Sequence, residues 1–246
     1  SIQLSECTLT NGLWRLLSDD APELTALIPK EVMRVGNITT KGDILLEGKR
    51  INGEIEAQTD AGSLAANIAI DSKGHYVAAL DGNRLDIARI IPTSPLIGTN
   101  ITLHAEGDWG ENTRPTESKL PPPFTAKIRA DLTHTQLLDY EYEHITIDGD
   151  YTSRGLDADI TLTDPCGNLT LQATYDVSGR VPHYSVTLDA DSLDLHTFGL
   201  IDIHEGNTFS TQLTADLRGN DIDHIIGKII VNDLTMHRPT DDYLIR

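Results

Sequence analysis

Basic residues are scarce in this chain. Its 246 residues include 19 Lys and Arg against 38 Asp and Glu, which gives a formal net charge of -19. A nucleic-acid partner is disfavoured, because phosphate backbones need a stripe of Lys and Arg to displace their counterions. Electrostatic docking on an anionic membrane surface is disfavoured for the same reason.

Cysteines and aromatic residues are also few. Cys7 and Cys166 are the only cysteines, so we expect two free thiols and neither a disulfide framework nor a four-cysteine metal site. Aromatic residues make up 5% of the chain, which leaves the packing to small and β-branched side chains.

Long apolar runs are absent as well. No segment approaches the ~20 residues that a membrane-spanning helix needs, and no signal-peptide pattern opens the chain. The first residues, Ser1 to Leu4, already have a strand pattern, and the last pattern is cut at Tyr243 to Ile245. We therefore expect a fragment of a longer protein, with any anchor or targeting segment outside it.

Strict alternation of apolar and polar residues is the dominant pattern. Between Phe124 and Leu132, for example, apolar residues occupy every second position. This period predicts antiparallel strands with one apolar and one polar face, on the order of sixteen strands of roughly 7 to 9 residues. Turn signals separate the runs at Gly42-Asp43, Gly48, Gly53, Asp81-Gly82-Asn83, Asp164 to Gly167, Ser178 to Arg180 and Gly206-Asn207.

Residues 38–107 recur as residues 145–219. Gly62 corresponds to Gly167, Tyr76 to Tyr184, and Leu85-Asp86 to Leu193-Asp194, at an offset near ~107 residues that indicates a tandem supersecondary unit. The predicted organisation is an entry segment 1–37, a repeat 38–110, a Pro-rich seam 111–123, a second repeat 124–220 and the start of a further repeat 221–246.

Helical periodicity is confined to short pieces, at Asn11 to Leu27, Leu85 to Ile91 and Leu193 to Ile201. These pieces are too short for a helical layer. Because open sheets of more than ~10 strands curl, split or close, we predict an all-β fold: an elongated, twisted and curled antiparallel sheet built from tandem repeats, with its apolar face on the concave side.

Four segments carry a family resemblance. Residues 27–38, from Leu27-Ile28-Pro29 to Val35-Gly36-Asn37-Ile38, resemble the entry to a repeat in the TamB family of translocation and assembly module subunits, within the AsmA-like superfamily. Residues 140–149 are similar to that family's Tyr-x-Tyr-x-x-Ile-x-Ile-x-Gly run. Residues 189–195 and 219–231 resemble its Ala-Asp-Leu and Gly-x-x-Ile-Asp passages. The motifs are loose in spacing, and their order and recurrence carry the resemblance over nearly the whole chain.

The resemblance implies a function in the bacterial periplasm. Members of the family are bridges tethered to the inner membrane, implicated in outer-membrane protein assembly and secretion and, through a lipid-lined β-groove, in phospholipid transport. It also implies a partner, an outer-membrane β-barrel assembly factor of the TamA type. We expect the family's anchor and C-terminal domain to lie outside these residues.

The alternating apolar residues are the candidate groove lining. They would contact acyl chains or hydrophobic segments of client proteins, and the candidates are Ile55, Ala57, Leu64, Ile68, Ile70, Leu103, Phe124, Ile128, Leu132, Ile160, Leu162, Leu169, Leu171, Val186, Leu188, Phe209, Leu213 and Leu217. The alternative is a β-sandwich or β-solenoid module for binding or adhesion with a closed core, because any half-buried antiparallel sheet has this alternation.

Chemistry-bearing motifs are missing. The nine histidines are scattered, His204-Glu205 lacks the second His of a zinc helix, and the turn Asp148-Gly149-Asp150 lacks the Glu-terminated loop of a calcium site. Sugar-binding sites usually have exposed Trp or Tyr platforms, but the only tryptophans are Trp14 and Trp109, and the leucine-rich segment around Trp14 favours its burial. We therefore predict a non-enzymatic protein with no catalytic residue, no cofactor and no metal.

Overall fold

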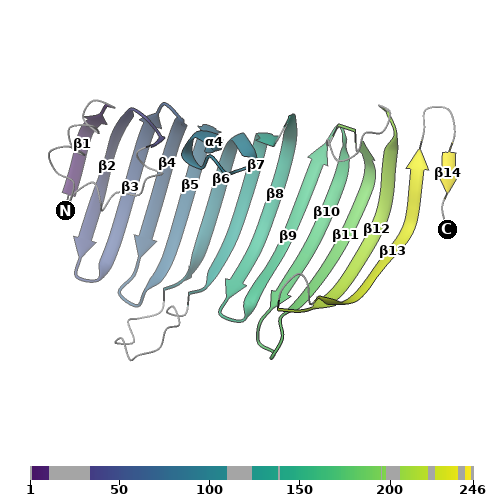
Figure 1. Cartoon of the computed structure of the whole chain (residues 1–246). Helices are drawn as coiled ribbons and strands as arrows, with labels where there is room; N and C mark the ends of the chain where they lie inside the picture. The colour runs from purple at the N-terminus through teal and green to yellow at the C-terminus, as the bar shows by residue number, and fades with distance from the viewer. Residues whose placement is uncertain are drawn as a thin grey trace. The chain divides into compact units, whose positions relative to one another are not determined.

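The computed structural model describes residues 2–10, 34–109, 124–137, 139–194, 196–197, 206–220, 225–237 and 242–244. Within these ranges the chain is almost entirely β-structure (Figure 1), with fourteen strands hydrogen-bonded in chain order from β1 to β14. Every pairing that the structure resolves is antiparallel, and the sheet does not close on itself. The predicted all-β, antiparallel fold class is confirmed.

The strands are mostly longer than the sequence pattern predicted, and one four-residue helix interrupts them. Their bounds are β1 Ile2–Leu9, β2 Ile38–Glu47, β3 Arg50–Thr59, β4 Gly62–Ile70, β5 His75–Asp86, α4 Ile87–Ile90, β6 Leu96–Asp108, β7 Ala126–Leu137, β8 Tyr140–Thr152, β9 Gly155–Asp164, β10 Gly167–Asp176, β11 His183–Asp194, β12 Thr208–Arg218, β13 Ile226–His237 and β14 Asp242–Leu244.

The chain divides into two compact units. Unit 1 comprises Ser1–Glu106 and Leu132–Glu141, and unit 2 comprises Gly107–Asp131 and Tyr142–Arg246. Each unit is described by itself below. The repeat boundaries expected from the sequence stay a prediction.

Several predicted turns lie inside strands. Gly42-Asp43 belongs to β2, Gly53 to β3, and Asp81-Gly82-Asn83 to β5. These glycines allow close packing, because a Cβ on Gly82 would clash with Leu85 Cδ1 and one on Gly42 would clash with the Glu54 carbonyl oxygen. At these three sites, a glycine in an alternating run indicates a crowded position within a strand. The predicted turns at these sites were wrong.

The helical predictions were also partly wrong. Leu85-Asp86 ends β5 and Leu193-Asp194 ends β11, so only Ile87–Ile90 forms the helix α4. Asp86 caps that helix, because its carboxylate Oδ1 accepts from the Arg89 backbone N–H at 2.9 Å. The segment Asn11 to Leu27, the Pro-rich stretch 120–123 and the end of Leu193 to Ile201 lie outside the described residues.

Two bulges occupy equivalent positions in the two repeats. Arg84 in β5 and Ser192 in β11 have left-handed backbones, with φ of 49° and 55°, and the β11 register shifts between Ala190 and Leu193. A bulge takes one N–H out of the ladder. The freed N–H of Arg84 donates to Asn100 Oδ1 at 2.8 Å, and that of Ser192 donates to Ser210 Oγ at 2.9 Å.

One backbone bond after each bulge is repeated as well. The Asp86 N–H donates to the Ala61 carbonyl at 2.8 Å in unit 1, and the Asp194 N–H donates to the Cys166 carbonyl at 2.8 Å in unit 2. Ala61 and Cys166 are both buried. The sequence repeat is therefore also a repeat of local hydrogen bonding.

In the described part of the chain, no helix has the length and apolarity needed to cross a membrane.

Candidate functional site

One face of each unit is apolar across several strands; we call it the apolar face. Residues directly opposite each other in antiparallel strands point to the same side of a sheet, so the register defines the face. In unit 1 the rows across β2, β3, β4 and β5 are Thr40-Ala57-Leu64-Gly82, Gly42-Ile55-Ala66-Leu80, Ile44-Gly53-Ile68-Ala78 and Leu46-Ile51-Ile70-Tyr76.

The apolar face of unit 2 extends over six strands, β8 to β13. Its central rows are Ile147-Ile160-Leu171-Leu188-Leu213-Val231 and Gly149-Ala158-Ala173-Val186-Ala215-Ile229. None of these twelve side chains is polar. An unbroken apolar row across six strands cannot arise from scattered surface hydrophobics.

The opposite face is polar in both units. In unit 1 the Lys41 Nζ lies 2.7 Å from Glu56 Oε2. In unit 2 the Arg129 Nε donates to Asp148 Oδ1 at 2.7 Å, and this bond raises the pKa of Arg129. These side chains are more than half exposed, so they contribute little to stability but keep that face in water.

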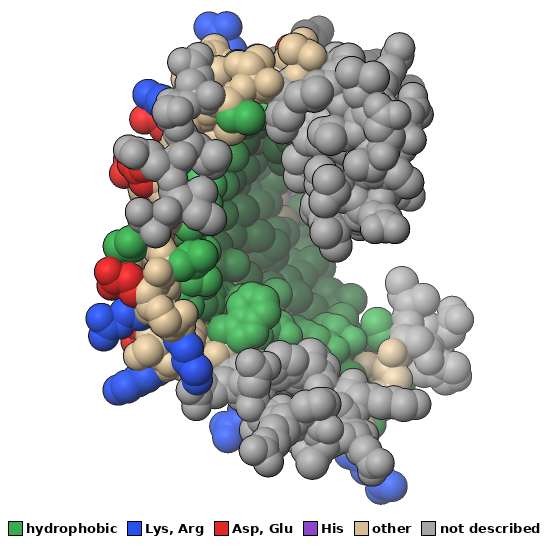
Figure 2. Space-filling view, turned by 90° about the vertical axis from the view of Figure 1, so that its left-hand side faces the viewer, with side chains coloured by type: hydrophobic (Ala, Val, Ile, Leu, Met, Phe, Trp, Pro, Cys, Tyr) green, Lys and Arg blue, Asp and Glu red, His purple; other side chains and the backbone are tan. Residues whose placement is uncertain are grey.

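Figure 2 shows the two faces from the side that lies at the left of Figure 1. Hydrophobic side chains line the hollowed side, and Lys, Arg, Asp and Glu side chains project from the outside. The described strands form a single sheet, so no second sheet among these residues covers the apolar face. A sandwich core of two facing sheets is not what the described residues build.

Strand pairing places fourteen of the eighteen predicted groove residues on the apolar face, and for the other four, Leu103, Phe124, Ile128 and Leu132, the same face follows only from alternation along the chain. Cross-strand pairs place most of them directly, among them Ala57 with Leu64 and Leu171 with Ile160. Leu103 follows Thr102, whose hydroxyl donates to Asp81 on the polar face at 3.0 Å. Their exposure differs: Ile68, Phe124 and Ile128 are 37 to 41% exposed, whereas Leu132 and Leu162 are buried.

Sequence reasoning missed a row of aromatic side chains on the apolar face of unit 2. It consists of Trp109, Phe124, Tyr151, Tyr175 and Tyr184, and we call it the aromatic row. Phe124 pairs with Trp109 across an isolated bridge, Tyr175 pairs with Tyr184, and Leu156 lies between Tyr151 and Tyr175. Only the strand register shows that these residues are neighbours; their spacing in sequence carries no signal.

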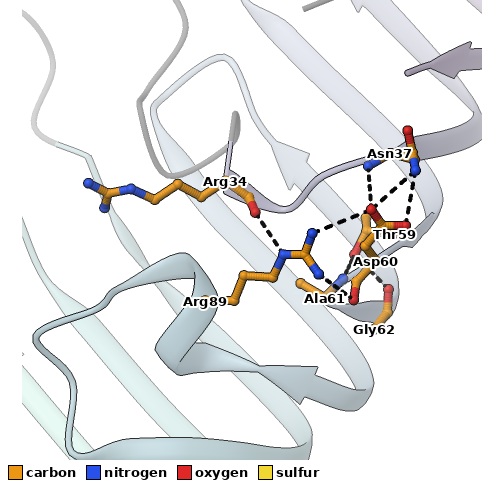
Figure 3. Close-up of polar contacts among 7 residues, drawn as sticks. All are labelled: Arg34, Asn37, Thr59, Asp60, Ala61, Gly62 and Arg89. Atoms are coloured by element: carbon orange, nitrogen blue, oxygen red, sulfur yellow. Dashed lines mark hydrogen bonds and ion pairs between the residues drawn. The ribbon is translucent and has the colours of Figure 1, made fainter. Parts of the chain in front are cut away.

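The opposite end of the strands is closed by hydrogen-bonded turns. In unit 1 the Asp60 carboxylate accepts from the Asn37 backbone N–H at 3.1 Å and from the Arg89 guanidinium at 3.4 Å (Figure 3). Arg89 also donates to the Arg34 carbonyl at 3.1 Å. The Asn37 N–H, together with the Asn37 side chain and Arg89, holds the pKa of Asp60 below its ordinary value.

Unit 2 closes the corresponding turn with one carboxylate. Asp164 accepts from the Glu143 N–H at 2.8 Å and from the Cys166 N–H at 2.9 Å. Burial raises the pKa of the adjacent Tyr142, and the nearby Cys166 and Asp164 act in the same direction. Buried Asn207 and Leu193 lie at the same strand ends. The apolar face therefore has one closed rim and one rim that carries the aromatic row.

The side chains that commonly bind metals are dispersed among the described residues. These residues contain no group of three or more His, Cys, Asp or Glu side chains that could hold a metal, and Cys7 and Cys166 are free thiols. Three described histidines instead lie within about 3 Å of a carboxylate: His134 with Glu141, His144 with Asp131 and His183 with Asp216. His183 is the least exposed of the three, because its side chain is 32% exposed.

Comparison with protein-family models, with curated proteins and with solved structures finds no match for this chain.

Proposed function

We propose that this chain is a TamB-like periplasmic bridge segment whose apolar face carries phospholipid acyl chains between membranes. The observation that carries the proposal is the unbroken apolar face of unit 2, from Ile147 in β8 to Val231 in β13. A lipid ligand fits this face because each CH₂ moved out of water contributes about 0.8 kcal/mol, so one acyl chain gains on the order of 10 kcal/mol.

The composition of the face supports movement of the ligand. Its central rows consist of Gly, Ala, Val, Ile and Leu, and the strands repeat the same chemistry at ~4.8 Å intervals. An acyl chain would find similar contacts at each successive strand, which favours sliding over tight retention. Exposed Ile229 and Val231 on β13, at 60% and 53%, extend this chemistry to the last long strand.

The resemblance to the TamB family supplies the cellular setting of the proposal. In that setting the chain is part of a protein anchored in the inner membrane, works in the periplasm and cooperates with an outer-membrane assembly factor of the TamA type. The same face could shelter hydrophobic strands of outer-membrane proteins during their assembly and secretion. The alternative, a binding or adhesion module with a closed core, is less well supported, because the described strands form one sheet.

Photo-crosslinking tests the proposal at matched positions. A photoreactive residue at Ile128 or Leu171, on the apolar face, should capture phospholipid from membrane extracts, and native mass spectrometry should detect lipid on the purified protein. The same residue at Lys127 or Thr170, which point to the polar face, should capture none. Equal capture at both sets of positions, or no lipid at any of them, would refute the conduit.

A further inference from the structure

The aromatic residues are unevenly distributed. The chain contains 2 Trp, 7 Tyr and 3 Phe, and five of these twelve form the aromatic row at one end of the strands of unit 2. The rows next to it on the apolar face contain only Gly, Ala, Val, Ile and Leu. In unit 1 the equivalent row is Leu46-Ile51-Ile70-Tyr76, with a single aromatic residue.

Ring contacts connect neighbouring members of the row. The Trp109 and Phe124 centroids are 5.9 Å apart with the rings edge to face at 78°, and Phe124 and Tyr151 are 6.0 Å apart. Tyr175 and Tyr184 stack at 5.0 Å and 26°. The rings remain accessible despite these contacts: Trp109 is 60% exposed and Tyr151 43%.

The polar atoms of the row are available. None of the hydroxyls of Tyr151, Tyr175 and Tyr184 has a hydrogen-bond partner among the described residues. Buried Tyr and Trp normally find such a partner, whereas at a membrane interface the ring stays apolar and the polar tip reaches water. The aromatic row resembles the membrane-interface arrangement, because it lies at the border between an apolar surface and solvent.

Positive charge lies just beyond the row. The connection between Tyr175 and Tyr184 contains Arg180, which lines a cavity of about 650 Å³ together with Arg218 and His183. Asp176, His183 and Arg218 pair in one register row that points to the polar face, opposite to Tyr175 and Tyr184. Neither arginine forms an ion pair with a described residue. Asp176 lines the same cavity, and the His183 Nε2 lies 3.1 Å from Asp216 Oδ1. Arg180 belongs to the connection at the strand ends, so in a chain of net charge -19 its guanidinium group favours an anionic group at this rim.

The length of the face fits one acyl chain. From Tyr175 in the aromatic row to Leu169 near the closed rim, β10 advances six residues, or ~20 Å at ~3.4 Å per residue. Half of a bilayer's hydrocarbon core is ~15 Å thick. A chain that starts at the aromatic row would therefore reach the buried end of the strands at Leu162 and Leu169.

We propose that the aromatic row fixes the depth of a bound phospholipid, with the phosphate head group on the Arg180 side and the acyl chains along the strands toward Leu169. This inference rests on the proposed function and adds an orientation to it. Lipids would then move from strand to strand sideways, with their head groups kept at one rim.

Depth-dependent quenching of Trp109 fluorescence tests the orientation. Trp14, outside the described residues, is replaced by Phe so that Trp109 is the single fluorophore. Phosphatidylcholine brominated near the carboxyl end of its acyl chains should quench Trp109 more strongly than phosphatidylcholine brominated near the methyl end. In a second variant, with Trp14 and Trp109 replaced by Phe and Leu169 by Trp, the order should reverse.

The outcomes separate the two proposals. Stronger quenching of Trp109 by the methyl-end bromines, or equal quenching by both, would overturn the depth assignment and leave the conduit standing. No quenching of either tryptophan by either lipid would overturn both. The combined change Tyr151→Leu, Tyr175→Leu and Tyr184→Leu keeps the area apolar, so lipid should still bind while the depth dependence of Trp109 quenching falls.

Discussion

The Thr99 hydroxyl lies 2.8 Å from the Thr135 hydroxyl, in the buried end of unit 1. Thr99 also donates to the Asn100 carbonyl at 2.9 Å, so its single hydrogen is used there and Thr135 must donate to Thr99. Both side chains are at most 3% exposed. The two buried hydroxyls therefore form their hydrogen bonds within the protein.

The pair predicts an asymmetric double-mutant cycle. Thr99→Val removes the hydrogen-bond partner of the buried Thr135 hydroxyl and should cost about 1–3 kcal/mol. Thr135→Val leaves the Thr99 bond to Asn100 intact and should cost less. The double variant should cost less than the sum, because both hydroxyls are gone. Urea unfolding measures all three, and strict additivity would contradict the pairing.

Two glycines should be irreplaceable. Gly62 and Gly167 have φ of 113° and 129°, and a Cβ at either would lie within 2.7 Å of backbone atoms of the neighbouring bulge. Gly62→Ala and Gly167→Ala should each destabilise by at least the ~1–3 kcal/mol of a strained backbone. Gly48 provides the control: its φ is 62° but a Cβ there meets nothing within 4 Å, so Gly48→Asn should change the unfolding midpoint little.

Acid should weaken the Asp60 turn. The pKa of Asp60 is lowered in the folded protein, so its contribution to stability is present above the ordinary Asp value of ~3.9 and is lost as pH falls through the lower folded value. Asp60→Asn should reduce stability at neutral pH, and its difference from the unmodified protein should shrink below about pH 4. Thermal unfolding from pH 7 downward would show this; a constant difference would contradict it.

Charge on the apolar face should abolish lipid binding. Ile160 and Thr161 are adjacent in β9 and point to opposite faces, with Leu171 and Thr170 as their respective partners on β10. Ile160→Asp should remove lipid detected by native mass spectrometry, whereas Thr161→Asp should retain it. Circular dichroism of both variants establishes that the sheet is intact, and loss of lipid from both would show that the effect is not specific to the face.

Alternation alone was sufficient to predict which side chains share a face. Leu171 and Leu213 were assigned from a period of two, and the register places both on the apolar face. Side chains alternate between the two faces along any single strand, so this prediction does not depend on which strands are paired. The repeat could also be seen in the sequence, because Gly62 and Gly167 both need a backbone with positive φ, which favours glycine at each position.

Other features depended on contacts between strands. The sequence predicted turns at Gly42, Gly53 and Gly82, but these glycines lie within strands, at positions where neighbouring atoms already take up the space of a Cβ. The bulges at Arg84 and Ser192 were not predicted, since neither residue type signals a left-handed backbone.

By itself, then, the sequence determined an all-β chain with one apolar and one polar face, because the alternation of side chains along a strand is a local property. Tertiary structure alone decided that Trp109, Phe124, Tyr151, Tyr175 and Tyr184 form one row and that Asp60 and Asp164 close the other rim. Cross-strand register, which no single strand encodes, determines which distant residues become neighbours.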